Sequence, residues 1–359
     1  MKEYKLFSRV QVTHTEVKHG VVLAPLTKSR ALVNLTNELM KLYAEKINTK
    51  LLASDGISIS SNELAYSHQS EIYGFHKHIE IWEKLTSAIH RSEGKIIIQL
   101  MHTGRINRPS NLPDGTRITA NSPYNTNTET ENVHDFPVPE EITSEALSHT
   151  KREFVAAAKN ALDAGFDGVE IDAAHGYLLE QILSPVTNSR SDAYSGSMIN
   201  RSKYILEVIT EVATAIGKDK TGIRLSPFSQ NSEMPVFPEI FETYIYLAEQ
   251  LNKIGIAFIH LVDNSSIGTS TALIELQKQI QTIFKNTIII PSASDKKGTM
   301  EHIQSNLIDT VAFGRPFIHI PEKVELFEND WSIHQDLSTN PYCSTDKKRN
   351  TDSAFFKDR

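Results

Sequence analysis

Residues 169–200 read VEIDAAHGYLLEQILSPVTNSRSDAYSGSMIN, and they join an apolar strand to the start of a helical pattern. Asp172, His175 and Tyr177 fall within six positions at the junction between the two. An acid, an imidazole and a phenol seldom gather at the end of an apolar strand for packing reasons. The stretch therefore predicts a strand–helix unit with a functional site where the strand ends.

The rest of the chain repeats this strand–helix unit. Short apolar, β-branched runs are bounded by turn signals, and amphipathic segments at 38–47, 79–91, 145–164, 201–216 and 241–254 fill most of the gaps. The eight runs are VVLAPL (21–26), LLASDGISI (51–59), KIIIQLMH (95–102), DGVEID (167–172), KTGIRLSP (220–227), GIAFIHLVD (255–263), NTIIIPSA (286–293) and LIDTVAFGRP (307–316).

Eight strands that alternate with helices predict the α/β class and a single (β/α)8, or TIM, barrel. A doubly wound open sheet is the alternative, but it usually has fewer strands and often a glycine-rich first turn. No G-x-G-x-x-G follows any of the eight runs. Two further signals delimit the helix predicted at 145–164. Thr143 is suited to cap its start, and Gly165 is suited to end it.

Two parts of the chain depart from a minimal barrel. Residues 104–141 form a long insertion after the third strand, rich in Asn, Thr and Pro. The C-terminal end is polar and charged. We expect residues 1–330 to form the barrel and residues 331–359 to form a tail that packs on the barrel or trails from it.

The composition narrows the classes of function. The formal net charge of −7 argues against a nucleic-acid or anionic-membrane partner, and no apolar run approaches the length of about 20 residues that spans a bilayer. The N-terminal residues lack the apolar core of a secretory signal. The single cysteine, Cys343, cannot form an intrachain disulfide. We expect a cytoplasmic protein, a monomer or homodimer, with no metal site.

In a barrel, the C-terminal ends of the strands face the mouth of the active site. This rule converts the strands into a set of candidate site residues. A mouth that offers Thr, Gln and two Arg suits a ligand with several carbonyl oxygens and a phosphate. The residues are Pro25, Leu26 and Thr27, then Ser54, Asp55 and Gly56, then Gln99 and His102, then Asp172, Arg224, Gly314 and Arg315.

Six segments of the chain resemble the Old Yellow Enzyme family, in order, from about residue 21 to 320. They are APLTKSRA (24–31), ASDGISIS (53–60), IIIQLMHTGR (96–105), the long segment 166–201 with HGYLLEQILSPVTN inside it, GIRLSP (222–227) and VAFGRP (311–316). The resemblance implies a (β/α)8 barrel that binds FMN, takes electrons from NADH or NADPH, and reduces an activated alkene such as an enone.

The resemblance also implies a role for each matching residue. Thr27 would hydrogen-bond the flavin C4 carbonyl, and Pro25, Leu26 and the backbone near Gly56 would line the ring. Gln99 would bind the pyrimidine edge of the flavin. The remaining cofactor contacts would be Arg224 near flavin N1 and the C2 carbonyl, and Ala293, Ser294, Gly314 and Arg315 around the phosphate.

Tyr177 matches the family's proton donor. In that mechanism the flavin N5 gives a hydride to the β-carbon of the alkene, and a phenol on the opposite face protonates the α-carbon. A tyrosine with an ordinary pKa near 10 suits this step, because it stays protonated at pH 7. For Tyr177 alone, the alternative is an aromatic side chain that packs on the barrel rim.

Asp172 departs from the family pattern. The family places two hydrogen-bond donors at the positions of Asp172 and His175, where they polarise the substrate carbonyl. His175 remains a donor, but an ionised carboxylate only accepts hydrogen bonds. Either Asp172 pairs with His175 and keeps it cationic, or the substrate carries its own donor, such as a hydroxyl or amine.

Further departures concern the cofactor site. Ser292, Ala293 and Ser294 stand where the family has two glycines, while Ser195 and Ile199 replace a glycine and a glutamate. They leave an alternative open: a diverged member that acts as a flavin-dependent isomerase or dehydrogenase, or that binds a ligand with weakened affinity for FMN. A barrel enzyme without flavin, such as a phosphate-sugar isomerase, has no support beyond the fold.

Overall fold

Eight parallel strands form a closed barrel in the computed structural model. The structure describes residues 10–13, 16–17, 21–23, 51–60, 76–106, 119–120, 139–228, 234–262, 271–291 and 310–313. The strands of the barrel are β3 (Val21–Leu23), β4 (Leu51–Ser58), β5 (Lys95–Met101), β8 (Gly168–Ala173), β9 (Thr221–Leu225), β10 (Phe258–Leu261), β11 (Thr287–Pro291) and β12 (Thr310–Phe313). They pair in chain order, and β12 closes the barrel onto β3. Each of the eight strands predicted from the sequence is confirmed.

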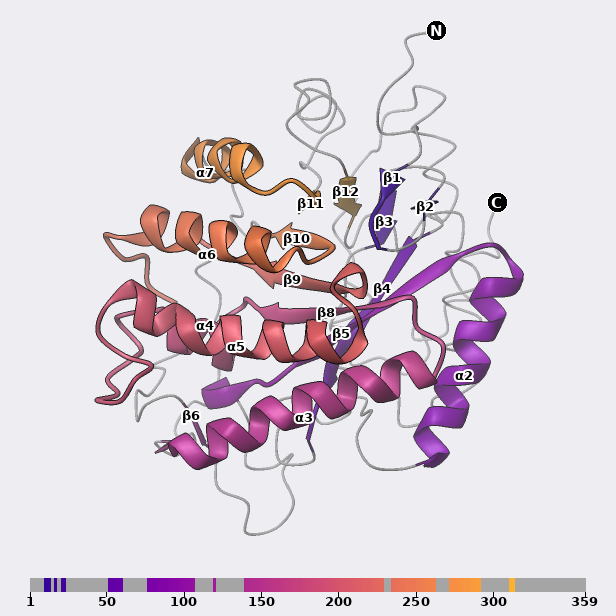
Figure 1. The fold of residues 1–359 in the computed structure, drawn as a ribbon, viewed down its shortest axis with the longest axis horizontal. Coiled ribbons are helices and arrows are strands. Elements are labelled where there is room, and N and C mark those ends of the chain that lie inside the picture. Colours follow the sequence, from indigo (N-terminus) through magenta and orange to yellow (C-terminus); the bar gives the residue numbers. More distant parts are fainter. Residues whose placement is uncertain are drawn as a thin grey trace, which may run out of the picture.

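The described helices lie along the outside of the barrel over part of its circumference, as Figure 1 shows. Helices α3, α5, α6 and α7 pack side by side in that order, and α2 packs against α3. Of the predicted helical segments, 38–47 lies outside the described residues. The helices are α2 (His76–Arg91), α3 (Ser144–Asp163), α4 (Leu178–Leu183), α5 (Met198–Ile216), α6 (Ile240–Ile254) and α7 (Thr271–Ile283).

The helix ends follow from local chemistry. The Thr143 hydroxyl accepts a hydrogen bond from the Ala146 N–H at 3.1 Å and caps α3. Gly165 follows that helix with a φ of +86° and Gly255 ends α6 with a φ of +80°, a region that favours glycine. Both signals predicted for α3 are therefore confirmed. None of the helices within the described ranges combines the length and the apolar character that a membrane crossing requires.

Alternation along the strands divides the core into two parts. On β5, Ile96 and Ile98 belong to the large core between barrel and helices, whereas Ile97 belongs to a small core inside the barrel. The inner core also holds Phe258, whose ring would lie 2.2 Å from a Cβ added to Gly222. Gly222 is therefore required for Phe258 to fill this level of the barrel.

A short hairpin contributes to the inner core. Strands β1 (Val10–Gln11) and β2 (Glu16–Val17) pair antiparallel, and Val12 between them is buried in the same cluster as Phe258. The methyl group of Thr13 packs at 3.0 Å from the Cβ position of Gly168, at the start of β8. The hairpin and the inner apolar side chains together form what we call the apolar floor of the barrel.

The ends of the insertion are among the described residues. Residues 104–106 form a 3-10 turn, and strands β6 (Thr119–Ala120) and β7 (Glu140–Glu141) pair parallel as a separate small sheet. The proposed tail at 331–359 lies outside the described residues, so its boundary stays a prediction.

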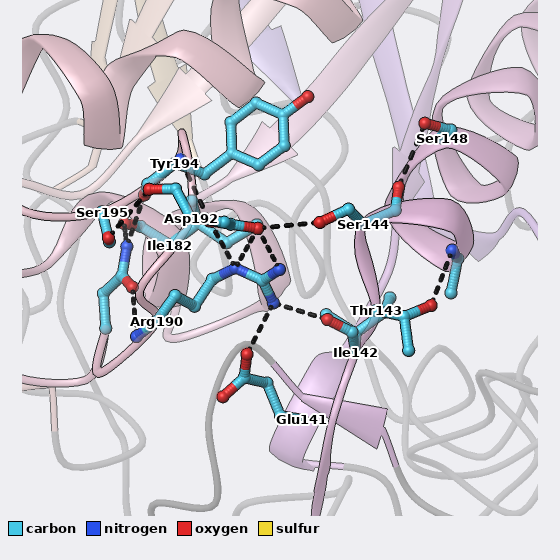
Figure 2. Close-up of polar contacts among 12 residues, drawn as sticks. Glu141, Ile142, Thr143, Ser144, Ser148, Ile182, Arg190, Asp192, Tyr194 and Ser195 are labelled. Atoms are coloured by element: carbon cyan, nitrogen blue, oxygen red, sulfur yellow. Dashed lines mark hydrogen bonds and ion pairs between the residues drawn. The ribbon is translucent and has the colours of Figure 1, made fainter.

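A polar cluster joins the end of the insertion to the loop before α5 (Figure 2). The Arg190 guanidinium binds the Asp192 carboxylate and donates to the Ile142 carbonyl, and its Nη1 lies 3.7 Å from Glu141. The Ser144 hydroxyl donates to Asp192 at 2.9 Å. These hydrogen bonds, Arg190 first, lower the pKa of Asp192 to about 2. The cluster fixes the loop between α4 and α5.

Two departures from the family pattern lie beside this cluster. The Ser195 hydroxyl donates to the Asp192 carbonyl at 3.0 Å, and Gly196 next to it takes the positive φ of +79°. Ile199 is exposed in the first turn of α5. Neither substitution removes a polar group from the interior of the barrel.

Candidate active site

Five polar side chains lie inside the barrel above the apolar floor. They come from neighbouring strands: Gln99 from β5, Glu170 and Asp172 from β8, Arg224 from β9 and His260 from β10. Gln99 is in register with Glu170, and Arg224 is in register with both Asp172 and His260. All five are at most 8% exposed. Since register partners in a parallel sheet project to the same face, the strands gather these groups in one place.

The lower level of this polar group is a hydrogen-bonded set of three residues. The Gln99 Nε2 donates to Glu170 Oε1 at 2.7 Å, and His260 Nδ1 lies 2.8 Å from Glu170 Oε2. Burial raises the pKa of Glu170, but His260 and Arg224 outweigh it and leave that pKa below its ordinary value. Burial lowers the pKa of His260. Glu170 is thus a carboxylate that is hydrogen-bonded to His260.

The upper level holds the acid that departs from the family pattern. Asp172 Oδ1 accepts from the Ala174 N–H at 3.0 Å, and its Oδ2 lies 3.3 Å from His175 Nδ1. His175 adopts a φ of +59°, and its N–H donates to the Ser226 hydroxyl at 3.0 Å. The structure therefore brings Asp172 and His175 together, as the pairing account predicts.

Tyr177 stands next to this pair at the start of α4. Its ring centroid lies 5.8 Å from that of His175, and its side chain is 5% exposed. Its N–H donates to the Ala174 carbonyl at 3.1 Å, and the Leu178 N–H donates to the His102 carbonyl beyond the end of β5 at 3.0 Å. Backbone hydrogen bonds thus fix the turn that carries the imidazole and the phenol.

Glu180 supports the same turn and was not among the predicted residues. Its Oε2 accepts from the Gly176 N–H at 2.6 Å, and its Oε1 accepts from the Ser226 hydroxyl at 2.7 Å and from the Tyr244 hydroxyl at 3.4 Å. Ser226 in turn receives the His175 N–H. Burial, with a smaller contribution from Asp172, raises the pKa of Glu180 to about 8.

This raised pKa predicts a pH-dependent stability. The unfolded chain loses the Glu180 proton near pH 4.5 and the folded protein near pH 8, so the folded state binds more protons between those values. The free energy of unfolding should fall by a few kcal/mol as the pH rises through this window, at about 1.4 kcal/mol per pH unit at most. Glu180→Gln should remove this dependence, measured by urea unfolding at pH 5, 7 and 9.

The control for this experiment is Glu249→Gln, which neutralises an exposed glutamate on α6. It should follow the wild-type dependence of unfolding free energy on pH. If Glu180→Gln and the wild type give parallel curves, Glu180 is ionised throughout the window and the prediction is wrong.

The described residues fit a flavin at the mouth. Arg224 Nε is buried and has no hydrogen-bond partner among the described residues, so it is available to a ligand oxygen or nitrogen. A Cβ at Gly56 would lie 2.4 Å from Met101 Sδ and 3.1 Å from Gln99 Oε1. The glycine at position 56 therefore lets the Gln99 amide and the Met101 side chain pack closely against β4. Seven further predicted contacts lie outside the described residues: Pro25, Leu26, Thr27, Ala293, Ser294, Gly314 and Arg315.

Comparisons with known proteins agree with this fold. The model of the NADH:flavin oxidoreductase / NADH oxidase family matches residues 5–331. The chain is 30% identical over 337 residues to 12-oxophytodienoate reductase 2 of Arabidopsis thaliana, covering 91% of this chain and 89% of the relative.

Two solved structures share this fold. Morphinone reductase superposes with a TM-score of 0.85 at 29% identity, over 92% of this chain and 91% of that chain. The old yellow enzyme from Trypanosoma cruzi superposes with a TM-score of 0.83 at 26% identity, over 92% and 93%.

The fold and these matches thus define a flavin-dependent oxidoreductase on a TIM barrel. The chain belongs to the NADH:flavin oxidoreductase family, and within it to the Old Yellow Enzymes.

Proposed function

We propose that the protein is an FMN-dependent NAD(P)H oxidoreductase that reduces an activated C=C bond, with Tyr177 as the proton donor. The observation that carries the proposal is the placement of Tyr177 beside His175, above the buried Gln99 and Arg224. Relatives named as reductases, among them morphinone reductase and 12-oxophytodienoate reductase 2, support it.

The proposed cofactor site combines described and undescribed residues. FMN, when bound, supplies the two-electron chemistry that links NAD(P)H to the alkene. Gln99, Arg224 and the backbone at Gly56 would hold its ring with Pro25, Leu26 and Thr27. Ala293, Ser294, Gly314 and Arg315 would hold its phosphate.

The residues of the turn after β8 would act on the substrate. His175 would donate a hydrogen bond to the substrate carbonyl oxygen, which favours the charge that develops there. The Tyr177 hydroxyl would then give its proton to the α-carbon. Asp172 would orient His175, because a carboxylate that accepts from Nδ1–H leaves Nε2 as the end that meets the substrate.

The carboxylate of Asp172 also favours a second candidate function, that of a diverged enzyme with altered chemistry. A carboxylate among the groups that meet a carbonyl oxygen disfavours simple enones and favours a substrate with its own donor. A flavin-dependent dehydrogenase of a hydroxyl-bearing substrate would fit the same geometry.

Cofactor uptake and half-reactions test the proposal. The purified protein, or the apoprotein after incubation with FMN, should show flavin absorption that NADH or NADPH bleaches under anaerobic conditions. An enone should then restore the colour, and steady-state rates should follow ping-pong kinetics. A protein that does not take up FMN ends the proposal. Bleaching without recovery by enones, but with recovery by another oxidant, favours the diverged enzyme.

A further inference from the structure

Glu170 is a buried charge that the proposed chemistry does not use. It is 0% exposed, and its two oxygens meet Gln99 Nε2 at 2.7 Å and His260 Nδ1 at 2.8 Å. Burial of a carboxylate destabilises the folded state unless the carboxylate is paired and hydrogen-bonded. Hydrophobic residues of similar volume often stabilise a core equally well. Glu170 lies between the apolar floor and the mouth, so it can act on the side chains that would contact a bound cofactor.

The first consequence of Glu170 is a fixed orientation of Gln99. An amide side chain can present either its oxygen or its nitrogen, but an ionised carboxylate only accepts hydrogen bonds. Glu170 therefore binds the amide nitrogen and leaves Gln99 Oε1 on the side of the Gly56 backbone. There Oε1 is an acceptor for an N–H group of a planar ligand.

The second consequence concerns charge. Arg224 is a permanent cation one strand away from Glu170, and its attraction contributes to the lowered pKa of that carboxylate. His260 is hydrogen-bonded to the same carboxylate, and burial lowers the pKa of its imidazole. The Glu170 carboxylate thus offsets the positive charge that Arg224 presents to a bound ligand.

We propose that Glu170 is a positioning residue for FMN: its carboxylate fixes the Gln99 amide with the oxygen toward the cofactor, and it offsets the charge of Arg224. This inference rests on the proposed function, since it needs FMN at the mouth. The negative charge that a flavin gains on reduction is stabilised by Arg224 and opposed by Glu170. Glu170 therefore keeps the affinity for reduced FMN closer to that for oxidised FMN.

The test compares wild type, Glu170→Gln and the exposed-site control Glu249→Gln, each loaded with FMN. The readouts are the midpoint potential of bound FMN and the dissociation constant of oxidised FMN. In Glu170→Gln the affinity for reduced FMN relative to oxidised FMN should rise by about 10-fold, seen as a more positive midpoint potential. The control should match the wild type.

Glu170→Asp separates charge from position. It keeps the carboxylate but withdraws it from the Gln99 amide by one methylene. Oxidised FMN should bind about 10-fold more weakly, as expected for a lost charge-assisted hydrogen bond, while the midpoint potential stays near that of the wild type. This variant also carries the test if circular dichroism shows that Glu170→Gln does not fold.

The outcomes distinguish the inference from the function on which it rests. A wild-type protein that does not take up FMN overturns both. A wild type that binds FMN, with unchanged potential in Glu170→Gln or unchanged FMN affinity in Glu170→Asp, overturns the role of Glu170 alone.

Discussion

Reoxidation of the reduced enzyme by an enone should be slower by about 10²- to 10⁴-fold in Tyr177→Phe than in the wild type. The phenol is the proposed proton donor, and its ring packs beside His175 with 5% of the side chain exposed. Phenylalanine keeps the ring and removes only the acidic hydrogen. Anaerobic stopped-flow measurements of the flavin absorbance give this rate directly.

Reduction of the same variant by NAD(P)H provides the internal control. That half-reaction transfers no proton from the phenol, so its rate should hardly change. A matched variant, Tyr194→Phe, removes a hydroxyl that donates to Glu207 at 3.0 Å on the surface of the barrel, and it should leave both half-reactions intact. Equal losses in both half-reactions of Tyr177→Phe would show that Tyr177 is structural.

Asp172→His should tighten the binding of phenols by roughly 10- to 1000-fold at pH 7. The Asp172 carboxylate, whose Oδ2 lies 3.3 Å from the imidazole Nδ1 of His175, stands where the family has a second donor, so a phenolate that binds as in the family would meet a negative charge. Two like charges 4 Å apart cost about 4 kcal/mol at an effective dielectric constant of about 20. Pairing with His175 recovers part of that cost. Titration of the FMN-loaded protein with a phenol, followed by absorbance, measures the dissociation constant.

Asp172→Asn separates the charge of the side chain from its shape. It removes the negative charge but retains an acceptor for the Ala174 N–H. We expect phenol affinity between that of the wild type and that of Asp172→His, and turnover of simple enones in the same order. Tight phenol binding by the wild type, with no change in either variant, would mean that the carboxylate does not face the ligand.

The barrel could be predicted from the sequence because the signals for its strands and helices are local. Each strand is a short apolar run, and the signals at Thr143 and Gly165 act within a few residues of the helix that they delimit. The same locality placed Asp172, His175 and Tyr177 together, since they lie within six positions at the end of β8 and in the turn that follows it. Their mutual contacts needed only a few residues of chain.

The supporting residues were missed because their partners are distant in sequence. Glu170 meets Gln99 across 71 positions and His260 across 90, and Glu180 meets Tyr244 across 64. The strand pattern did contain one usable signal. Glu170 lies two positions before Asp172 and so shares its face, and an acid within an apolar strand requires a partner. Which residue that partner is depends on the register of the barrel.

The apolar floor closes the barrel at the end opposite the mouth. Phe258 fills the level that Gly222 leaves open, and Val12 of the hairpin packs against the same cluster. A cofactor laid across the mouth would therefore seal Glu170 and His260 into a closed compartment. The cofactor would then slow the exchange of protons with this pair, so its protonation state would stay constant through turnover. Hydrogen exchange at His260 Nδ1 should slow when FMN binds; an unchanged exchange rate would reveal a second path for water.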